Sequence, residues 1–114
     1  MDINGLGKAR LAAKIANDKK GENIIILNIG KVSNITDYFV IVSAESSKRV
    51  ETIAEAIAEE FKKNKLSIVH FEGFNDCLWV LLDASDVILH IFRSDMREFY
   101  ALERLWSSAE QVKL

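Results

Sequence analysis

The chain has 114 residues, of which 49% are hydrophobic and 28% are charged, and this composition is typical of one globular domain with a single modest core. The formal net charge of −2 leaves no basic excess to neutralise a phosphate backbone, which argues against sequence-specific nucleic-acid binding as the main activity. The lone Cys77 cannot form an intrachain disulfide, and no apolar run is long enough to span a membrane, so we expect a protein of a reducing cytoplasm.

The N-terminal part of the chain predicts one helix followed by two strands. Residues 1–10 lack the apolar core of a signal peptide. Residues 6–20 predict a helix with a narrow apolar stripe, which we expect to be lightly buried. The β-branched run at 23–29 and the apolar run at 37–43 predict strands, and because nearly every position is apolar, we expect both to be covered on two faces.

The clearest helix lies at residues 47–64 and follows a hydroxyl N-cap within residues 44–47. Its apolar residues recur at the spacing of one helical face: Val50, Ile53, Ala54, Ile57, Ala58 and Phe61. The charged residues of the opposite face are typical of a solvated surface with helical ion pairs rather than of a site. We therefore expect this helix to lie on a sheet.

The rest of the chain predicts three strands and a last helix. The strands are expected at residues 66–71, 78–83 and 86–92. The helix is expected at 95–108, with Asp95 and Glu98 resembling a capping box, and the tail from residue 109 is expected to be frayed. The prediction is thus a single α/β (α+β) domain of order α-β-β-α-β-β-β-α, with a mixed sheet of about five strands and flanking helices.

The last two strands are close enough to form a hairpin. A turn at residues 84–85 would put Trp79 opposite His90 and Leu81 opposite Ile88, so that these side chains share one face of the sheet. A four-residue loop that includes both neighbouring aspartates is an equally good interpretation. On the last helix, the expected inward arc holds Phe99, Leu102, Leu105 and Trp106, and the neighbouring arc toward the rim holds Met96, Tyr100 and Glu103.

Few residues support catalytic chemistry. There is no Gly-rich phosphate loop, and one cysteine with two distant histidines does not make a zinc site, so we expect no cofactor and no metal. Asp83 and Asp86 could form a carboxylate pair, but aspartates at a hairpin end more often cap the turn. Cys77 and His90 could form a nucleophilic pair, but a lone cysteine is usually a packing residue. We interpret His90 as a hydrogen-bonded structural histidine that stacks against Trp79.

Two aromatic residues suggest a binding surface instead. Trp79 and Tyr100 lie on faces that also carry charge, and amphipathic aromatic residues near Arg and Glu are typical of interaction hot spots. Trp106 is assigned mainly to packing. From the residues alone, an exposed binding patch and an ordinary core are about equally good interpretations.

These same residues carry a resemblance to the ribosomal silencing factor family, also called Iojap-like. The pattern W-x-L-L-D-x-x-D-V-x-x-H-x-F, starting at Trp79, precedes R-x-x-Y-x-L-E-x-L-W, starting at Arg97. Further matches, in order along the chain, are Ser33, residues 37–41, Ser46 and Glu72-Gly73. The chain departs from the family's usual turns at Ser43-Ala44 and at Ala84-Ser85.

The resemblance implies a domain similar to the nucleotidyltransferase core but without its catalytic motif. It implies a non-enzymatic protein that binds ribosomal protein fourteen of the large ribosomal subunit. A bacterial and an organellar home both fit, and the lack of a transit segment favours the cytoplasm of a bacterium. Bound there, such a protein blocks joining of the small subunit and represses translation when nutrients are scarce. The family also implies a homodimer when the protein is free. The alternative from a different class is a small metal-dependent nucleotidyltransferase-like enzyme that uses Asp83 and Asp86.

By matching position, the resemblance implies a partner-binding surface of Trp79, Arg97, Tyr100, Leu102 and Glu103. Asp83, Asp86 and His90 are possible accessory residues, because acidic groups at the hairpin end suit a basic ribosomal protein. Helical periodicity conflicts with this surface at Leu102, which it places inward.

Overall fold

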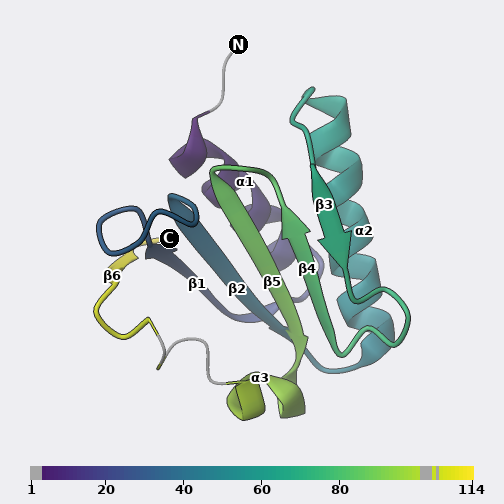
Figure 1. Cartoon of the computed structure of the whole chain (residues 1–114). Helices are drawn as coiled ribbons and strands as arrows, with labels where there is room; N and C mark the ends of the chain where they lie inside the picture. The colour runs from purple at the N-terminus through teal and green to yellow at the C-terminus, as the bar shows by residue number, and fades with distance from the viewer. Residues whose placement is uncertain (1–3, 101–103, 105) are drawn as a thin grey trace.

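The computed structural model describes residues 4–100, 104 and 106–114, except for the side chains of residues 98–100. Its elements, in chain order, are α1 (Gly5–Asp18), β1 (Glu22–Asn28), β2 (Tyr38–Ala44), α2 (Ser47–Lys63), β3 (His70–Glu72), β4 (Trp79–Asp83), β5 (Val87–Arg93), α3 (Ser94–Tyr100) and β6 (Glu110–Val112) (Figure 1). No helix in the described ranges is long and apolar enough to cross a bilayer.

The strands form one mixed sheet in the order β3-β4-β5-β2-β1-β6. β2 and β5 run parallel at its centre, and the other neighbouring strands of the described chain pair antiparallel. The predicted single α+β domain with a mixed sheet is confirmed, with six strands instead of about five. The central strands are apolar at almost every position because both of their faces are covered, as predicted for 37–43.

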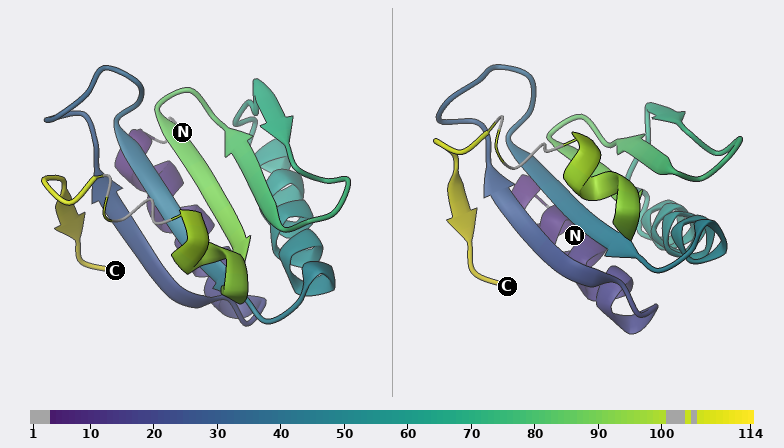
Figure 2. Two further views of the ribbon diagram at one scale, coloured as in Figure 1. Left: turned by 60° about the horizontal axis from the view of Figure 1, so that its bottom comes forward. Right: turned by 90° about the horizontal axis from the view of Figure 1, so that it is seen from below.

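Helices α1 and α2 cover one face of the sheet, which we call the helical face (Figure 2). Helix α2 packs on the sheet through the predicted stripe of apolar side chains, and Phe61 near the end of the helix is fully buried. The Ser46 hydroxyl caps α2 by accepting a hydrogen bond from the Arg49 N–H at 3.1 Å. The expectation that the first helix is lightly buried is wrong. Its buried stripe is made of alanines, whose small side chains let the helix approach the sheet closely: Ala9, Ala12, Ala13 and Ala16.

The opposite face carries a smaller, more aromatic cluster, which we call the aromatic face: Leu27, Ile29, Phe39, Ile41, Ile88 and Phe92. Helix α3 lies over this face (Figure 2). Met96 of α3 and Trp106 beyond it pack against the cluster, both partly buried. Trp106 meets Phe39 edge to face, with 5.6 Å between ring centroids, which fits its predicted packing role.

The structure corrects the predicted extent of the third strand and the predicted fraying of the tail. β3 has only three residues, because the Leu66 N–H donates to the Phe61 carbonyl and the segment that follows α2 closes the helix instead of joining the sheet. The tail from residue 109 is not frayed, since β6 pairs with β1 and places Val112 opposite Ile26.

The last helix also differs from the prediction. Residues 106–108 form a turn, and the Ala109 N–H donates to the Trp106 carbonyl at 2.9 Å. Asp95 is not an N-cap. It lies in the first turn of α3, and its carboxylate accepts from the Arg93 guanidinium at 2.7 Å.

Candidate functional site

The hairpin of β4 and β5 places the predicted site residues on the aromatic face. Trp79 lies opposite Phe92, and Leu81 lies opposite His90. The predicted register is therefore displaced by two residues. The turn consists of Ser85 and Asp86, because Ala84 remains in the ladder and its N–H donates to the Val87 carbonyl. Since a displacement by two keeps the alternation of faces, the expected sharing of one face is confirmed.

Among the described residues, the Trp79 indole contacts the rings of Phe92 and His90, both from β5. Its ring stacks on Phe92, with centroids 5.0 Å apart and an interplanar angle of 24°. Its Nε1–H donates to Nδ1 of His90 at 3.1 Å. The residue is half-buried, so part of its surface is covered by the chain and part faces solvent. An aromatic residue held in this way presents a defined apolar surface with a fixed orientation.

His90 lies beneath this tryptophan in the centre of the aromatic face. It is 4% exposed, and the Phe39 ring meets it edge to face at 4.7 Å. Burial lowers the pKa of the His90 imidazole to about 4, because the charged form cannot be solvated there. The predicted hydrogen-bonded histidine against Trp79 is confirmed, although the ring is tilted by 37° to Trp79 rather than stacked on it.

Arg97 joins α3 to the ends of two strands. Its guanidinium donates to the Ser43 hydroxyl at 2.8 Å, and it also donates to the backbone carbonyl of Asn23. These contacts hold α3 against β1 and β2. Arg97 therefore has a structural role, and its contact with a partner stays a prediction.

The other three predicted partner-binding residues lie at the edge of what the structure describes. Tyr100 is the last residue of α3, and its side chain is outside the described part of the chain. Leu102 and Glu103 are also outside the described residues. The inward or outward orientation of Leu102 is thus untested.

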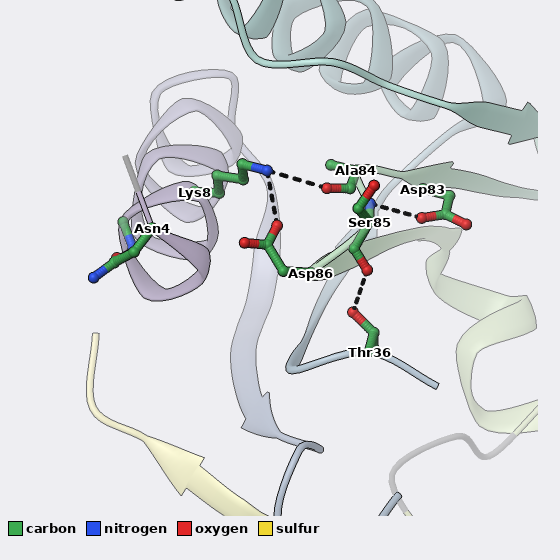
Figure 3. Close-up of polar contacts among 8 residues, drawn as sticks. Asn4, Lys8, Thr36, Asp83, Ala84, Ser85 and Asp86 are labelled. Carbon is green, nitrogen blue, oxygen red and sulfur yellow. Dashed lines mark hydrogen bonds and ion pairs between the residues drawn. The ribbon is translucent and has the colours of Figure 1, made fainter. Parts of the chain in front are cut away.

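The aspartates at the hairpin end do not face each other (Figure 3). Asp83 accepts a hydrogen bond from the Ser85 N–H at 2.8 Å, which is the predicted capping of the turn. Asp86 points to the other side and accepts from Nζ of Lys8 at 2.8 Å. Lys8 also donates to the Ala84 carbonyl, so these contacts tie α1 to the hairpin. No group of three or more potential metal-binding side chains occurs within the described ranges.

The structure also separates the conceivable nucleophilic pair. Cys77 belongs to the core of the helical face, and its thiol contacts the Phe74 carbonyl at 3.5 Å. His90 belongs to the aromatic face, so the sheet lies between them. Burial raises the pKa of the Cys77 thiol, which disfavours the reactive thiolate. Its interpretation as a packing residue is confirmed.

Two neighbours of the site, Phe39 and Phe92, were not predicted as site residues from the sequence. Phe92 supplies the surface on which Trp79 stacks, and Phe39 packs its ring edge against His90. Phe92 could have been predicted from the alternation of side chains along a strand, because it follows His90 by two residues on β5 and therefore lies on the same face. Phe39 comes from β2, and only the parallel pairing of Phe39 with Ile88 brings it close.

The fold and this surface define a class: a small α+β domain whose aromatic sheet face carries a fixed tryptophan, with no group of three or more potential metal ligands among the described residues. A sequence model of the family described as "Ribosomal silencing factor during starvation" matches residues 4–114. The chain belongs to the ribosomal silencing factor family.

Individual relatives agree with this assignment. The chain is 38% identical to the ribosomal silencing factor of Bacillus subtilis, with 92% of this chain and 89% of that protein covered. It is 31% identical to the chloroplastic protein Iojap of Arabidopsis thaliana, which covers 99% of this chain and 47% of that protein. A crystal structure of a Chromobacterium violaceum protein superposes with a TM-score of 0.88 at 30% identity, covering 94% and 88% of the two chains.

Proposed function

We propose that this protein represses translation by binding the large ribosomal subunit through ribosomal protein fourteen, so that the small subunit cannot join. Family membership supports the ribosome as the partner, because the bacterial relatives are named as ribosomal silencing factors. In this proposal the protein is not an enzyme and acts in the bacterial cytoplasm when nutrients are limited.

The observation that carries the proposal is the partly exposed indole of Trp79 on the aromatic face. A tryptophan that is already stacked and hydrogen-bonded loses little conformational freedom when a partner covers it. Residues of this kind supply much of the binding energy of protein interfaces. We assign the contact surface to Trp79 together with Arg97, Tyr100, Leu102 and Glu103.

The proposed mechanism requires no conformational change of the ribosome. The domain has principal extents of 33 × 31 × 23 Å. An object of this size on the face where two subunits meet keeps them apart by its bulk alone. Glu103 and the acidic hairpin end would then meet basic groups of the ribosomal protein.

The enzymatic alternative receives less support from the geometry. Asp86 is engaged by Lys8, and Asp83 is engaged by the turn that it caps, so the two carboxylates do not converge on one point (Figure 3). Two-carboxylate chemistry would require them to share a ligand or substrate atom.

Sedimentation through a sucrose gradient tests the proposal. The purified protein is run with large subunits, with small subunits and with a mixture of both. We expect it to migrate with large subunits only, and the mixture should contain fewer joined ribosomes. A protein that stays at the top of every gradient that contains subunits would contradict the proposal. Sedimentation equilibrium of the free protein tests the proposed homodimer.

Matched variants locate the surface. Trp79→Ala should weaken association with large subunits by about thirtyfold or more, the size expected of a hot spot. Phe71→Ala is the control, because Phe71 is a large apolar residue that is 61% exposed but lies on the other face of the sheet, beside Leu82. Tyr100→Ala and Glu103→Arg should also abolish association with the fold intact. Equal effects of the Trp79 and Phe71 substitutions would show that the aromatic face is not the contact surface.

A further inference from the structure

The hydrogen bond between Trp79 and His90 fixes which nitrogen of the imidazole carries its proton. The indole Nε1–H can only donate, so Nδ1 of His90 must accept and cannot carry a hydrogen. A neutral imidazole has one N–H, and here that hydrogen is on Nε2. Protonation would turn Nδ1 into a donor and break the bond.

The other nitrogen of the His90 ring, Nε2, lies in a different environment. Nε2 of His90 is fully buried and has no hydrogen-bond partner among the described residues. A buried donor without an acceptor destabilises a fold, because it has lost its hydration without replacement. The rings of Phe39 and Phe92 next to it are apolar and offer Nε2 no hydrogen-bond acceptor. For folding alone, histidine is therefore a poor choice at this position.

We infer that His90 is a positioning residue, whose Nδ1 holds the Trp79 indole in the orientation in which the aromatic face binds its partner. The inference rests on the proposed function, since it says what His90 contributes to that binding surface. The Phe92 stack fixes the plane of the indole, and the bond to His90 fixes the direction of its N–H edge. Together they remove rotamers that a free tryptophan would populate, so the partner meets a side chain that is already ordered.

If His90 has this role, the substitution His90→Phe should weaken binding to the large subunit without lowering the stability of the fold. His90→Phe removes the acceptor and also the unsatisfied Nε2 donor. We expect the midpoint of urea unfolding at pH 7 to stay unchanged or to rise, while association with isolated large subunits weakens by about two- to tenfold. A histidine with only a structural role would give the reverse, a lower midpoint with unchanged binding, and that result would overturn the inference.

A double-mutant cycle with Trp79→Phe isolates the pair. Phenylalanine at position 79 has no N–H to orient, so adding His90→Phe to Trp79→Phe should cost no further binding. Rescue comes from His90→Asn, whose amide oxygen lies near the former Nδ1 and should recover part of the affinity that His90→Phe loses. Additive losses in the double mutant would overturn the inference.

Nuclear magnetic resonance of the free protein tests the hydrogen bond without any ribosome. Long-range ¹H–¹⁵N spectra should show His90 protonated on Nε2, and the Trp79 indole N–H should exchange slowly with solvent. A Trp106→Phe variant assigns the two indole signals, since the chain has two tryptophans. Protonation on Nδ1 would overturn the inference even if binding were intact. If the wild-type protein does not associate with large subunits, the proposed function fails, and these spectra still decide whether His90 holds the indole.

Discussion

The two faces of the sheet are built on different principles. The helical face is aliphatic and closed, and its largest side chains, such as Phe61 and Ile57, have no exposure to solvent. The aromatic face has a smaller buried cluster, a partly exposed tryptophan and a buried imidazole with one nitrogen that has no partner among the described residues. One face therefore supplies most of the stability, while the other keeps features that cost stability and suit binding.

The largest expected effect is on the helical face. Phe61→Ala should lower the free energy of unfolding by about 3–5 kcal/mol, because it removes a fully buried ring and leaves a cavity. Leu81→Ala on the aromatic face is the comparison, and since Leu81 is only partly buried, its loss should be less than half as large. Urea denaturation measures both. Equal losses would break the distinction between the two faces.

The second effect is a pH dependence that belongs to the aromatic face. The pKa of His90 falls from an ordinary 6.5 to about 4 in the folded protein. Between these two pH values, the His90 imidazole is therefore neutral in the folded protein but protonated in the unfolded chain. Stability from this group is complete above pH 6.5 and is lost as the pH falls toward 4, by about 3 kcal/mol in total.

Unfolding midpoints between pH 7 and pH 4 measure this loss, and matched variants assign it. His90→Phe should remove the part of the pH dependence that appears below 6.5. His70→Asn is the control, because His70 is 58% exposed and lies in the edge strand β3. An unchanged pH profile in His90→Phe would show that another group controls stability in this range.

The smallest effect concerns the hairpin end. Lys8→Met removes the ion pair to Asp86 and the bond to the Ala84 carbonyl, and it should cost about 1 kcal/mol because the pair is partly open to solvent. Lys14→Met on the same helix is the control, since Lys14 is exposed. Its unfolding midpoint should stay within error of the wild type. A loss as large as that of Phe61→Ala would mean that this contact, rather than the core, holds α1 in place.

Strong periodic signals were sufficient to predict much of the fold. The α2 stripe, the central strands and the alternation of faces in the hairpin follow from local patterns of burial. The hairpin register could not be predicted in this way, because it depends on whether Ala84 belongs to the strand pairing or to the turn. The positive φ of Ser85 decides this, and it cannot be predicted from the residue type. The burial of α1 was also missed, because alanines give a weak hydrophobic signal although they allow the closest packing.

The site was predicted less completely than the fold. Sequence reasoning found Trp79, His90 and their common face, since these depend on parity along two neighbouring strands. It missed Phe39, which reaches them from β2 through a pairing distant in sequence. β6 was missed for the same reason, because three residues have no periodicity of their own and become a strand only beside β1.

The position of β5 has a consequence for how the chain folds. β5 lies between β2 and β4, and its partner β2 ends more than forty residues earlier in the chain. The β1–β2 pair and the β3–β4 pair become one sheet only when residues 87–93 join them. During its own synthesis, the protein must therefore expose two incomplete half-sheets until almost the whole chain has left the ribosome, and loop closure over that distance should set the rate of folding.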